Sequence, residues 1–283
     1  MKTVRIIPRL DIKGPNLVKG IHFEGLRVLG NPNDYANEYY NSFADELMYV
    51  DIVASLYERN SLSQIISETA KEIFIPITVG GGLRSIEDIK QVLKAGADKI
   101  SLNTAAIKNP NLIKETSLSF GSSTIVVAIE AIKDSKGKYF AYTDNGREFT
   151  GRDVLEWAQE VEDLGAGEII ISSVDNEGTG EGFDIELTKM ISNAVSIPVI
   201  AHGGAGSISD VVDVIKIGNA DAVSIASILH YGAKDRFDMK KLSDNKEGNF
   251  EFLNKKTSFN KINPVNLIEL KKELINNKIN CRI

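Results

Sequence analysis

The chain has 283 residues, of which 42% are hydrophobic and 25% are charged, and its formal net charge is −6. This length and composition predict one globular domain with a large core, and the negative charge balance argues against a general nucleic-acid-binding surface. No apolar stretch reaches the length of a membrane span, so no membrane association is expected.

The N-terminal segment, MKTVRIIPRLDIKG, has one short apolar run that ends at Asp11. It therefore predicts a strand and not a signal peptide. The single cysteine, Cys281, lies in a polar C-terminal segment, so a disulfide within the chain is excluded. A reducing compartment, the cytoplasm, is the expected location.

Short β-branched runs alternate with amphipathic segments along the chain. The predicted strands are residues 4–10, 46–51, 75–79, 99–102, 125–129, 168–172, 199–201 and 222–225, and helical patterns include 34–43, 62–73, 87–95 and 153–164. The almost unbroken apolar character of the strands is typical of parallel strands that are buried on both faces. Eight strand and helix pairs predict a single (β/α)8 TIM barrel over residues 1–283, an α/β fold whose functional residues lie at the C-terminal ends of its strands.

The sequence contains an internal duplication. Residues 78–107, TVGGGLRSIEDIKQVLKAGADKISLNTAAI, recur in outline as residues 200–229, IAHGGAGSISDVVDVIKIGNADAVSIASIL. Such a long spacing indicates two duplicated half-barrels. Glycines and small or polar residues follow strand ends in both halves, at Gly81, Gly82, Asn103 and Thr104 and at Gly203, Gly204, Ala226 and Ser227. Backbone N–H groups and hydroxyls in such loops can hold a phosphate, so a substrate with two phosphates is predicted; the alternative is that the glycines serve only tight turns.

Polar residues also stand out at other predicted strand ends. Asp11 does not directly precede a helix, so helix capping explains it poorly. Asp51 either contributes to a site or holds the loop above it. His202 and His230 lack the spacing of a metal site, and His230 is expected to pack or hydrogen-bond locally. Neither a metal nor a cofactor is expected.

A family resemblance is carried by seven segments in order: RIIPRLDIK, LVKGIHFEGLR, TVGGGLRS, GADKISLNTAAI, LGAGEIIISSVDNEGT, IAHGGAGS and ADAVSIASILHY. Over residues 4–231, and again from residue 263, the chain resembles the cyclase subunit of imidazole glycerol phosphate synthase. In that family the barrel takes ammonia from a separate glutaminase subunit and acts on a bis-phosphorylated ribulosyl-formimino aminoimidazole carboxamide nucleotide. The products are imidazole glycerol phosphate, for histidine biosynthesis, and aminoimidazole carboxamide ribotide (AICAR).

The resemblance implies roles for residues at the strand C-termini. Asp11 matches a catalytic aspartate, and Glu130 stands where the family has a second one. Two carboxylates on opposite strands suit a reaction that moves protons on both sides of the substrate. Lys19 matches a lysine that reaches over the substrate, although an exposed loop lysine is the alternative. Further residues expected to bind the substrate or its phosphates are Asp51, Ser172, Glu177 and Gly178.

Charged residues open four of the predicted strands: Arg5, Glu46, Lys99 and Glu168. In a structural interpretation they form alternating salt bridges that close the barrel. In the family they form the gate of an ammonia tunnel, and because buried charges are costly unless paired, a purely structural plug could have been apolar. Asp98 resembles a residue that meets the glutaminase, which implies a glutaminase partner at the strand N-terminal face.

Some residues depart from the family pattern. Glu130 and Glu177 replace aspartates, His202 replaces a serine and Arg9 replaces a cysteine. All four are expected to face or flank one cavity, and the extra methylene of Glu130 would move a catalytic oxygen by about 1 Å. Relative to the family, residues 233–262 form an insertion after the eighth strand, expected on the catalytic face, and a closing helix is predicted over 264–275.

These departures leave several functions open. A divergent but true cyclase is favoured by Asp11, Lys19 and both phosphate loops. A paralogue of the kind found in surface-glycan clusters (O-antigen or flagellin) would instead supply ammonia for acetamidino-sugar synthesis. The single-chain sister isomerase of histidine synthesis has the same duplicated barrel but would not need the gate charges. A non-catalytic barrel that activates a glutaminase is the remaining alternative.

Overall fold

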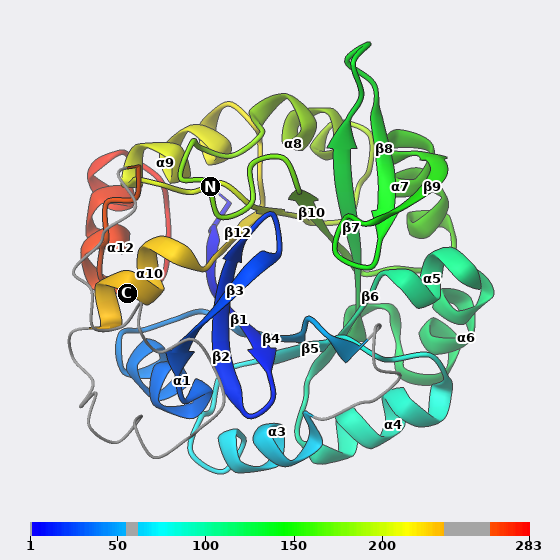
Figure 1. Ribbon diagram of the computed structural model, residues 1–283, viewed down its shortest axis with the longest axis horizontal. Coiled ribbons are helices and arrows are strands. Elements are labelled where there is room, and N and C mark those ends of the chain that lie inside the picture. The colour runs from blue at the N-terminus through cyan, green and yellow to red at the C-terminus, as the bar shows by residue number, and fades with distance from the viewer. Residues whose placement is uncertain (1, 55–61, 235–260) are drawn as a thin grey trace.

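The computed structural model describes residues 2–54, 62–234 and 261–283. In this part of the chain, eight parallel strands form a barrel: β1 (Arg5–Lys13), β4 (Leu47–Asp51), β5 (Ile77–Gly80), β6 (Lys99–Leu102), β7 (Ile125–Lys133), β10 (Glu168–Ser173), β11 (Val199–His202) and β12 (Ala222–Ile225). β7 pairs with β10, which closes the sheet on itself (Figure 1). The predicted (β/α)8 TIM barrel is therefore confirmed.

Helices surround the barrel (Figure 1). They are α1 (Pro32–Asn41), α3 (Ser63–Thr69), α4 (Ile86–Ala95), α5 (Thr104–Lys108), α6 (Asn111–Phe120), α7 (Val154–Asp163), α8 (Ile185–Ser192), α9 (Ile208–Lys216), α10 (Ser227–Lys234) and α12 (Leu267–Asn276). Within the described ranges, no helix is long and apolar enough to cross a membrane.

The duplicated segments begin their helices in the same way. Ser85 precedes α4 and Ser207 precedes α9, and each serine donates its backbone N–H to an aspartate three residues later, at 3.0 Å to Asp88 and 2.8 Å to Asp210. A cap of this kind contributes about 1 kcal/mol. The helices start immediately after the glycine loops, so the caps fix where each loop ends.

Antiparallel hairpins follow β1 and β7, at equivalent places in the two halves. β2 (Asn16–Ile21) and β3 (Glu24–Gly30) extend β1, while β8 (Tyr139–Thr143) and β9 (Glu148–Asp153) extend β7. Lys19, which lies on β2, was expected in a loop, and neither hairpin was predicted from the sequence. In Figure 1 the β2–β3 hairpin lies over the interior of the ring of strands. Both hairpins thus add side chains to the end of the barrel where function was predicted.

Apolar side chains pack on both sides of the barrel strands. A large cluster packs between the strands and the surrounding helices. A second cluster occupies the barrel interior and consists of Ile7, Met48, Val126, Ile170, Ile200 and Ala222. The interior of the barrel is therefore apolar between its charged end and its C-terminal mouth.

The C-terminal segment closes the barrel from outside. α12 begins at Leu267 with Asn266 as its N-cap, three residues later than the predicted start at 264. Lys271 on this helix is buried and forms an ion pair of 2.9 Å with Asp45. Cys281, expected in a polar tail, is buried beside Val4. Most of the predicted insertion, residues 235–260, lies outside the described residues.

Candidate active site

A cavity of about 280 Å³ opens at the C-terminal ends of the strands. The predicted residues that line it are Asp51, Gly81, Gly82, Asn103, Thr104, Glu130 and Ser172, together with Arg9. The structure therefore brings the first predicted phosphate loop, one predicted catalytic carboxylate and two predicted substrate-binding residues into one space.

The glycines of the first loop are required by its backbone path. Gly81 and Gly82 have φ of +94° and +73°, which side chains rarely adopt. A Cβ at Gly81 would also collide with the backbone carbonyl oxygen of Asp51. On the facing loop, the Oδ1 atom of Asn103 is buried without a hydrogen-bond partner in the described part of the chain. An acceptor left unpaired in this way is available to a ligand.

Glu130 lies on β7 and reaches into this cavity beneath the β8–β9 hairpin. Its Oε2 accepts a hydrogen bond of 2.9 Å from the backbone N–H of Gly146. Burial raises the pKa of Glu130 to about 7, although Gly146 and the charge of Arg9 act in the opposite direction. A carboxyl group with this pKa exchanges a proton readily at neutral pH.

The turn of the β8–β9 hairpin is held over the cavity. Asp144, Asn145 and Gly146 have φ of 54°, 62° and 80°, which gives three consecutive left-handed residues in the turn. The side chain of Asn145 donates to the backbone oxygen of Ile52 at 2.6 Å. Sequence reasoning missed these residues, although an Asp-Asn-Gly segment between alternating apolar residues is a recognisable hairpin signal.

Asp11 belongs to a buried group of four charged side chains, here called the charge cluster: Arg9, Asp11, Lys19 and Glu177. Arg9 Nε donates to Asp11 Oδ1 at 2.8 Å, Lys19 Nζ lies 3.6 Å from Asp11 Oδ2, and Lys19 also pairs with Glu177. Each residue is at most 5% exposed. Burial alone would raise the pKa of Asp11, but Arg9 and Lys19 hold it below its usual value.

The charge cluster also docks the β2–β3 hairpin. Glu177 accepts from the backbone N–H of Phe23 at 3.3 Å, and its backbone oxygen accepts from His22 N–H at 2.9 Å. A Cβ at Gly178 would collide with the backbone of Gly20. Lys19 is only 2% exposed, so the alternative of an exposed loop lysine is wrong.

A second, much smaller cavity of about 10 Å³ lies at the ends of β11 and β12. The predicted residues that line it are Glu177, Gly178, Gly203, Gly204, Ala226 and Ser227, together with His202. We call this group of residues the second cradle. Gly203 and Gly204 have φ of +93° and +106°, again a conformation that favours glycine.

The departures from the family pattern face two cavities, not the one predicted. Arg9 and Glu130 line the larger cavity, whereas Glu177 and His202 line the second cradle. The reason is that the charge cluster runs across the barrel mouth, with Arg9 at one cavity and Glu177 at the other. His230 packs away from both: its Nδ1 lies 2.6 Å from the hydroxyl of Tyr39, in agreement with the local role predicted for it.

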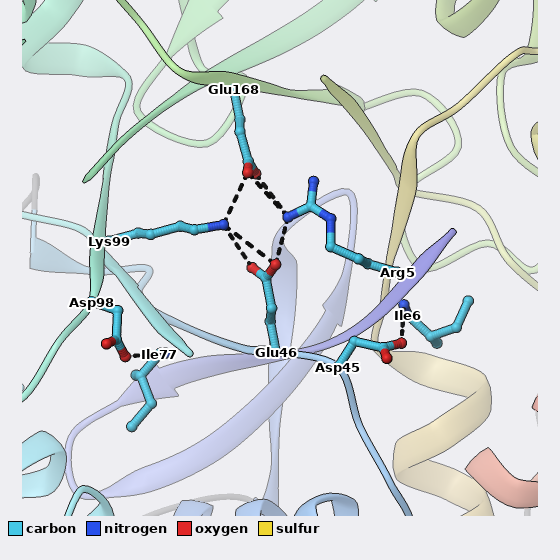
Figure 2. A network of polar contacts seen from close by, with 8 residues as sticks. All are labelled: Arg5, Ile6, Asp45, Glu46, Ile77, Asp98, Lys99 and Glu168. Carbon is cyan, nitrogen blue, oxygen red and sulfur yellow. Dashed lines mark hydrogen bonds and ion pairs between the residues drawn. The ribbon is translucent and has the colours of Figure 1, made fainter. Parts of the chain in front are cut away.

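The four charges at the opposite end of the barrel form a closed ring (Figure 2). Arg5 Nη1 lies 2.5 Å from Glu46 Oε1 and 3.1 Å from Glu168 Oε1. Lys99 Nζ lies 3.1 Å from Glu46 Oε2 and 2.9 Å from Glu168 Oε1. The predicted alternating salt bridges are therefore confirmed, and we call this set the gate ring.

Asp98 lies beside the gate ring and has a partner within the chain. Its Oδ2 accepts from the backbone N–H of Ile77 at 2.9 Å, as Asp45 does from Ile6 at 2.8 Å (Figure 2). Asp98 therefore fixes the start of β5, and a contact with a glutaminase remains a prediction. Among the residues that the structure describes, no group of acidic, histidine and cysteine side chains is suited to hold a metal ion.

Comparison with known proteins identifies the family. The profile of the family described as "Histidine biosynthesis protein" matches residues 5–235. Imidazole glycerol phosphate synthase subunit HisF of Legionella pneumophila is 58% identical over 210 residues, which cover 74% of this chain and 99% of that protein. The HisF subunit of Petrotoga mobilis is 48% identical over 241 residues, 85% of this chain and 95% of that protein. That of Methanococcus vannielii is 49% identical over 261 residues, 85% of this chain and 96% of that protein. The chain therefore belongs to the histidine biosynthesis protein family, within the group of imidazole glycerol phosphate synthase HisF subunits.

Proposed function

We propose that this chain is the cyclase subunit of an imidazole glycerol phosphate synthase. It uses ammonia from a glutaminase partner on the bis-phosphorylated ribulosyl-formimino aminoimidazole carboxamide nucleotide and releases imidazole glycerol phosphate and AICAR. One observation carries the proposal: Asp11 and Glu130 lie at the same end of the barrel on β1 and β7, four strands apart around it, and each half adds a glycine loop suited to a phosphate. A linear substrate with a phosphate at each end would span the barrel mouth and pass between these carboxylates.

The two carboxylates have different environments, which supports different roles. Asp11 pairs with two cations and stays ionised, so it suits the general base that removes a proton from the attacking nitrogen. Glu130, with its pKa raised to about 7, suits the general acid that protonates the leaving oxygen or nitrogen. Loss of water, C–N cleavage and ring closure all need proton transfers of this kind.

The strand N-terminal end of the barrel has features that suit delivery of ammonia. The gate ring closes the entrance, and the apolar interior cluster of Ile7, Met48 and their neighbours lies between it and the larger cavity, which Met48 also lines. Neutral ammonia can cross an apolar passage, whereas ammonium would lose its hydration. We assign Arg5, Glu46, Lys99 and Glu168 to an ammonia gate.

The surface around the gate ring supports docking of a glutaminase there. Phe43, Phe74 and Ile217 lie in connections from a helix to the next strand, and each is at least 50% exposed. In a barrel these connections lie at the strand N-terminal end, where the gate ring is found. Single exposed apolar side chains are common on protein surfaces, but several on one face are the pattern expected of an interface when they form a patch. We place the partner on this face, with Asp98 at its contact.

A second candidate function, ammonia supply for acetamidino-sugar synthesis, is favoured by one observation. Asp11 is paired with both Arg9 and Lys19, and within the described residues it is absent from the linings of both cavities. A catalytic carboxylate that is fully paired would not take part in ring closure unless the charge cluster opens.

The experiment that separates these functions is turnover of the nucleotide substrate with excess ammonium salt, which bypasses the partner. Loss of substrate absorbance is followed for the wild type and for Asp11→Asn. Turnover by the wild type and its loss in the variant support the cyclase. A folded wild-type protein that shows no turnover but stimulates a glutaminase would overturn the cyclase proposal and favour ammonia supply or simple activation.

A further inference from the structure

We propose that His202 binds the ligand group that enters the second cradle and that its ring takes up a proton when that group is a phosphate. The identity of the group as a phosphate rests on the proposed function. His202 ends β11 and directly precedes Gly203 and Gly204, so its ring stands at the start of the loop that forms the cradle.

The hydrogen bonds of His202 fix its tautomer in the free protein. Its Nδ1 lies 2.9 Å from the backbone oxygen of Ser224. A carbonyl oxygen only accepts, so Nδ1 carries the hydrogen, and in the neutral ring Nε2 is left as an acceptor. This Nε2 atom is buried and has no hydrogen-bond partner among the described residues. Because His202 is only 4% exposed, bulk water does not supply one.

A second unpaired atom faces the same space. The hydroxyl Oγ of Ser224 also has no hydrogen-bond partner among the described residues. Ser224 is the register partner of His202 on β12, and both line the second cradle. Buried polar groups are paired in the great majority of cases, so two unpaired atoms on adjacent strands point to a ligand that is bound there.

The charges around His202 explain why its ring is neutral without a ligand. Burial, followed by the charge of Arg9, holds the pKa of His202 well below its usual value, and Asp11 offsets only part of this. Lys19, on β2, also lowers this pKa, and Glu177, in the segment after β10, lines the same cavity as His202. Together these neighbours carry two positive and two negative charges, so they add no net charge to the site.

A phosphate changes this balance. It brings a charge of about −1.5 to −2 at neutral pH. The backbone N–H groups of the glycine loop and of the N-terminus of α10, at Ser227, can donate hydrogen bonds to it but do not neutralise its charge. A protonated His202 would donate from Nδ1 to Ser224 and from Nε2 to the phosphate, and hydrogen bonds between charged groups are the stronger kind. A neutral hydroxyl group would instead donate to Nε2 without proton uptake. The protonation state of His202 therefore reports which type of ligand the cradle takes.

The test uses the imidazole ¹⁵N signals of the whole protein, which has three histidines. Inorganic phosphate is added at neutral pH, and we expect the His202 signal to change from the neutral Nδ1–H tautomer to the imidazolium. His202→Asn keeps an amide that can donate to Ser224 but lacks Nε2, and we expect it to bind phosphate at this cradle about tenfold more weakly or worse. Ser227→Asp places a negative charge in the cradle and should abolish the phosphate-dependent change of the His202 signal, while the His22 signal stays as in the wild type.

The same preparations separate this inference from the proposed function. A wild-type enzyme that turns over the nucleotide, but whose His202 ring stays neutral on phosphate binding, would overturn the inference alone. Unchanged phosphate affinity in His202→Asn, or absence of phosphate binding, would overturn it as well. A phosphate-dependent imidazolium signal in a protein without turnover would support the inference and remove the cyclase proposal.

Discussion

Replacing Glu130 by glutamine tests the environment assigned to this carboxyl group. Glutamine has nearly the same shape and keeps an oxygen that can accept the 2.9 Å hydrogen bond from Gly146, but it cannot ionise. In the folded wild type the group keeps its proton up to a pKa of about 7, whereas in the unfolded chain it loses the proton near 4.5. The folded state therefore holds more protons across this interval, and the wild-type stability falls as the pH rises through it.

The size of this loss follows from the two values. The interval from 4.5 to about 7 corresponds to about 3 kcal/mol, at 1.36 kcal/mol per pH unit. Because the larger cavity gives Glu130 some contact with water, we expect the wild type to lose about 1–3 kcal/mol of its free energy of unfolding over this interval. Relative to the wild type, Glu130→Gln should therefore gain this much stability between pH 5 and pH 8. It should also lose ammonium-driven turnover by about 10²–10⁴, because the proton donor is gone.

Urea unfolding at pH 5 and pH 8, followed by circular dichroism, measures the difference. Ionisable groups common to both proteins cancel when the variant is subtracted from the wild type. Glu148→Gln, which removes one negative charge from an exposed position on β9, is the matched control. A difference between Glu130→Gln and the wild type that is the same at both pH values would refute the assignment of a raised pKa.

Other positions offer sharp tests. Lys99→Met should open the gate ring, so that more glutamate is formed per cyclised product while ammonium-driven turnover is retained; an unchanged ratio would exclude the gate. Ser227→Asp should raise KM for the bis-phosphorylated substrate about tenfold or more through charge repulsion, and an unaltered KM would remove Ser227 from the phosphate site. Lys271→Met leaves Asp45 buried without its cation, so urea unfolding should show a loss of about 3–5 kcal/mol; a loss under 1 kcal/mol would contradict that pairing.

Sequence reasoning succeeded where a local pattern carries the structure. The barrel strands could be predicted because short apolar β-branched runs recur between amphipathic helices. The glycine loops could be predicted because their backbone requires glycine. Gly81 has a left-handed φ, and a side chain at this position would collide with the backbone of Asp51. The gate ring followed from the position of its charges at strand starts.

Features that depend on contacts between distant segments could not be predicted from the sequence. The pairing of Lys19 with Glu177 joins residues 158 positions apart, and it depends on the path of the β2–β3 hairpin, which no local periodicity records. The division of the barrel mouth into two cavities has the same origin, because it is the charge cluster that separates them. The hydrogen bond from Gly146 to Glu130 likewise depends on how the β8–β9 turn folds back over β7.

The duplication explains why the two carboxylates are comparable at all. On β1, Asp11 pairs in register with Val50, and on β7, Glu130 pairs with Ser172. Val50 and Ser172 occupy the same place in their halves. Val50 follows Glu46 by four positions, and Ser172 follows Glu168 by four positions. Asp11 and Glu130 are therefore equivalent positions on one repeated scaffold.

The halves differ in the cations near these carboxyl groups: Lys19 lies 3.6 Å from Asp11, and two positions before the carboxylate stands Arg9 on β1 but Ala128 on β7. Arg9 donates a hydrogen bond to Asp11, which favours the ionised form of that carboxyl group. Glu130 interacts with Arg9 only through the electrostatic effect of its charge. Burial raises the pKa of both carboxyl groups. For Asp11 this is opposed by both Arg9 and Lys19, whereas among the described residues Arg9 is the only cation that lowers the pKa of Glu130. Equivalent positions of a repeated scaffold thus differ in pKa because two cations, Arg9 and Lys19, act on one carboxyl group and, within the described ranges, only Arg9 acts on the other. The base and acid roles proposed for Asp11 and Glu130 depend on this asymmetry, which suits a reaction with proton transfers on both sides of its substrate.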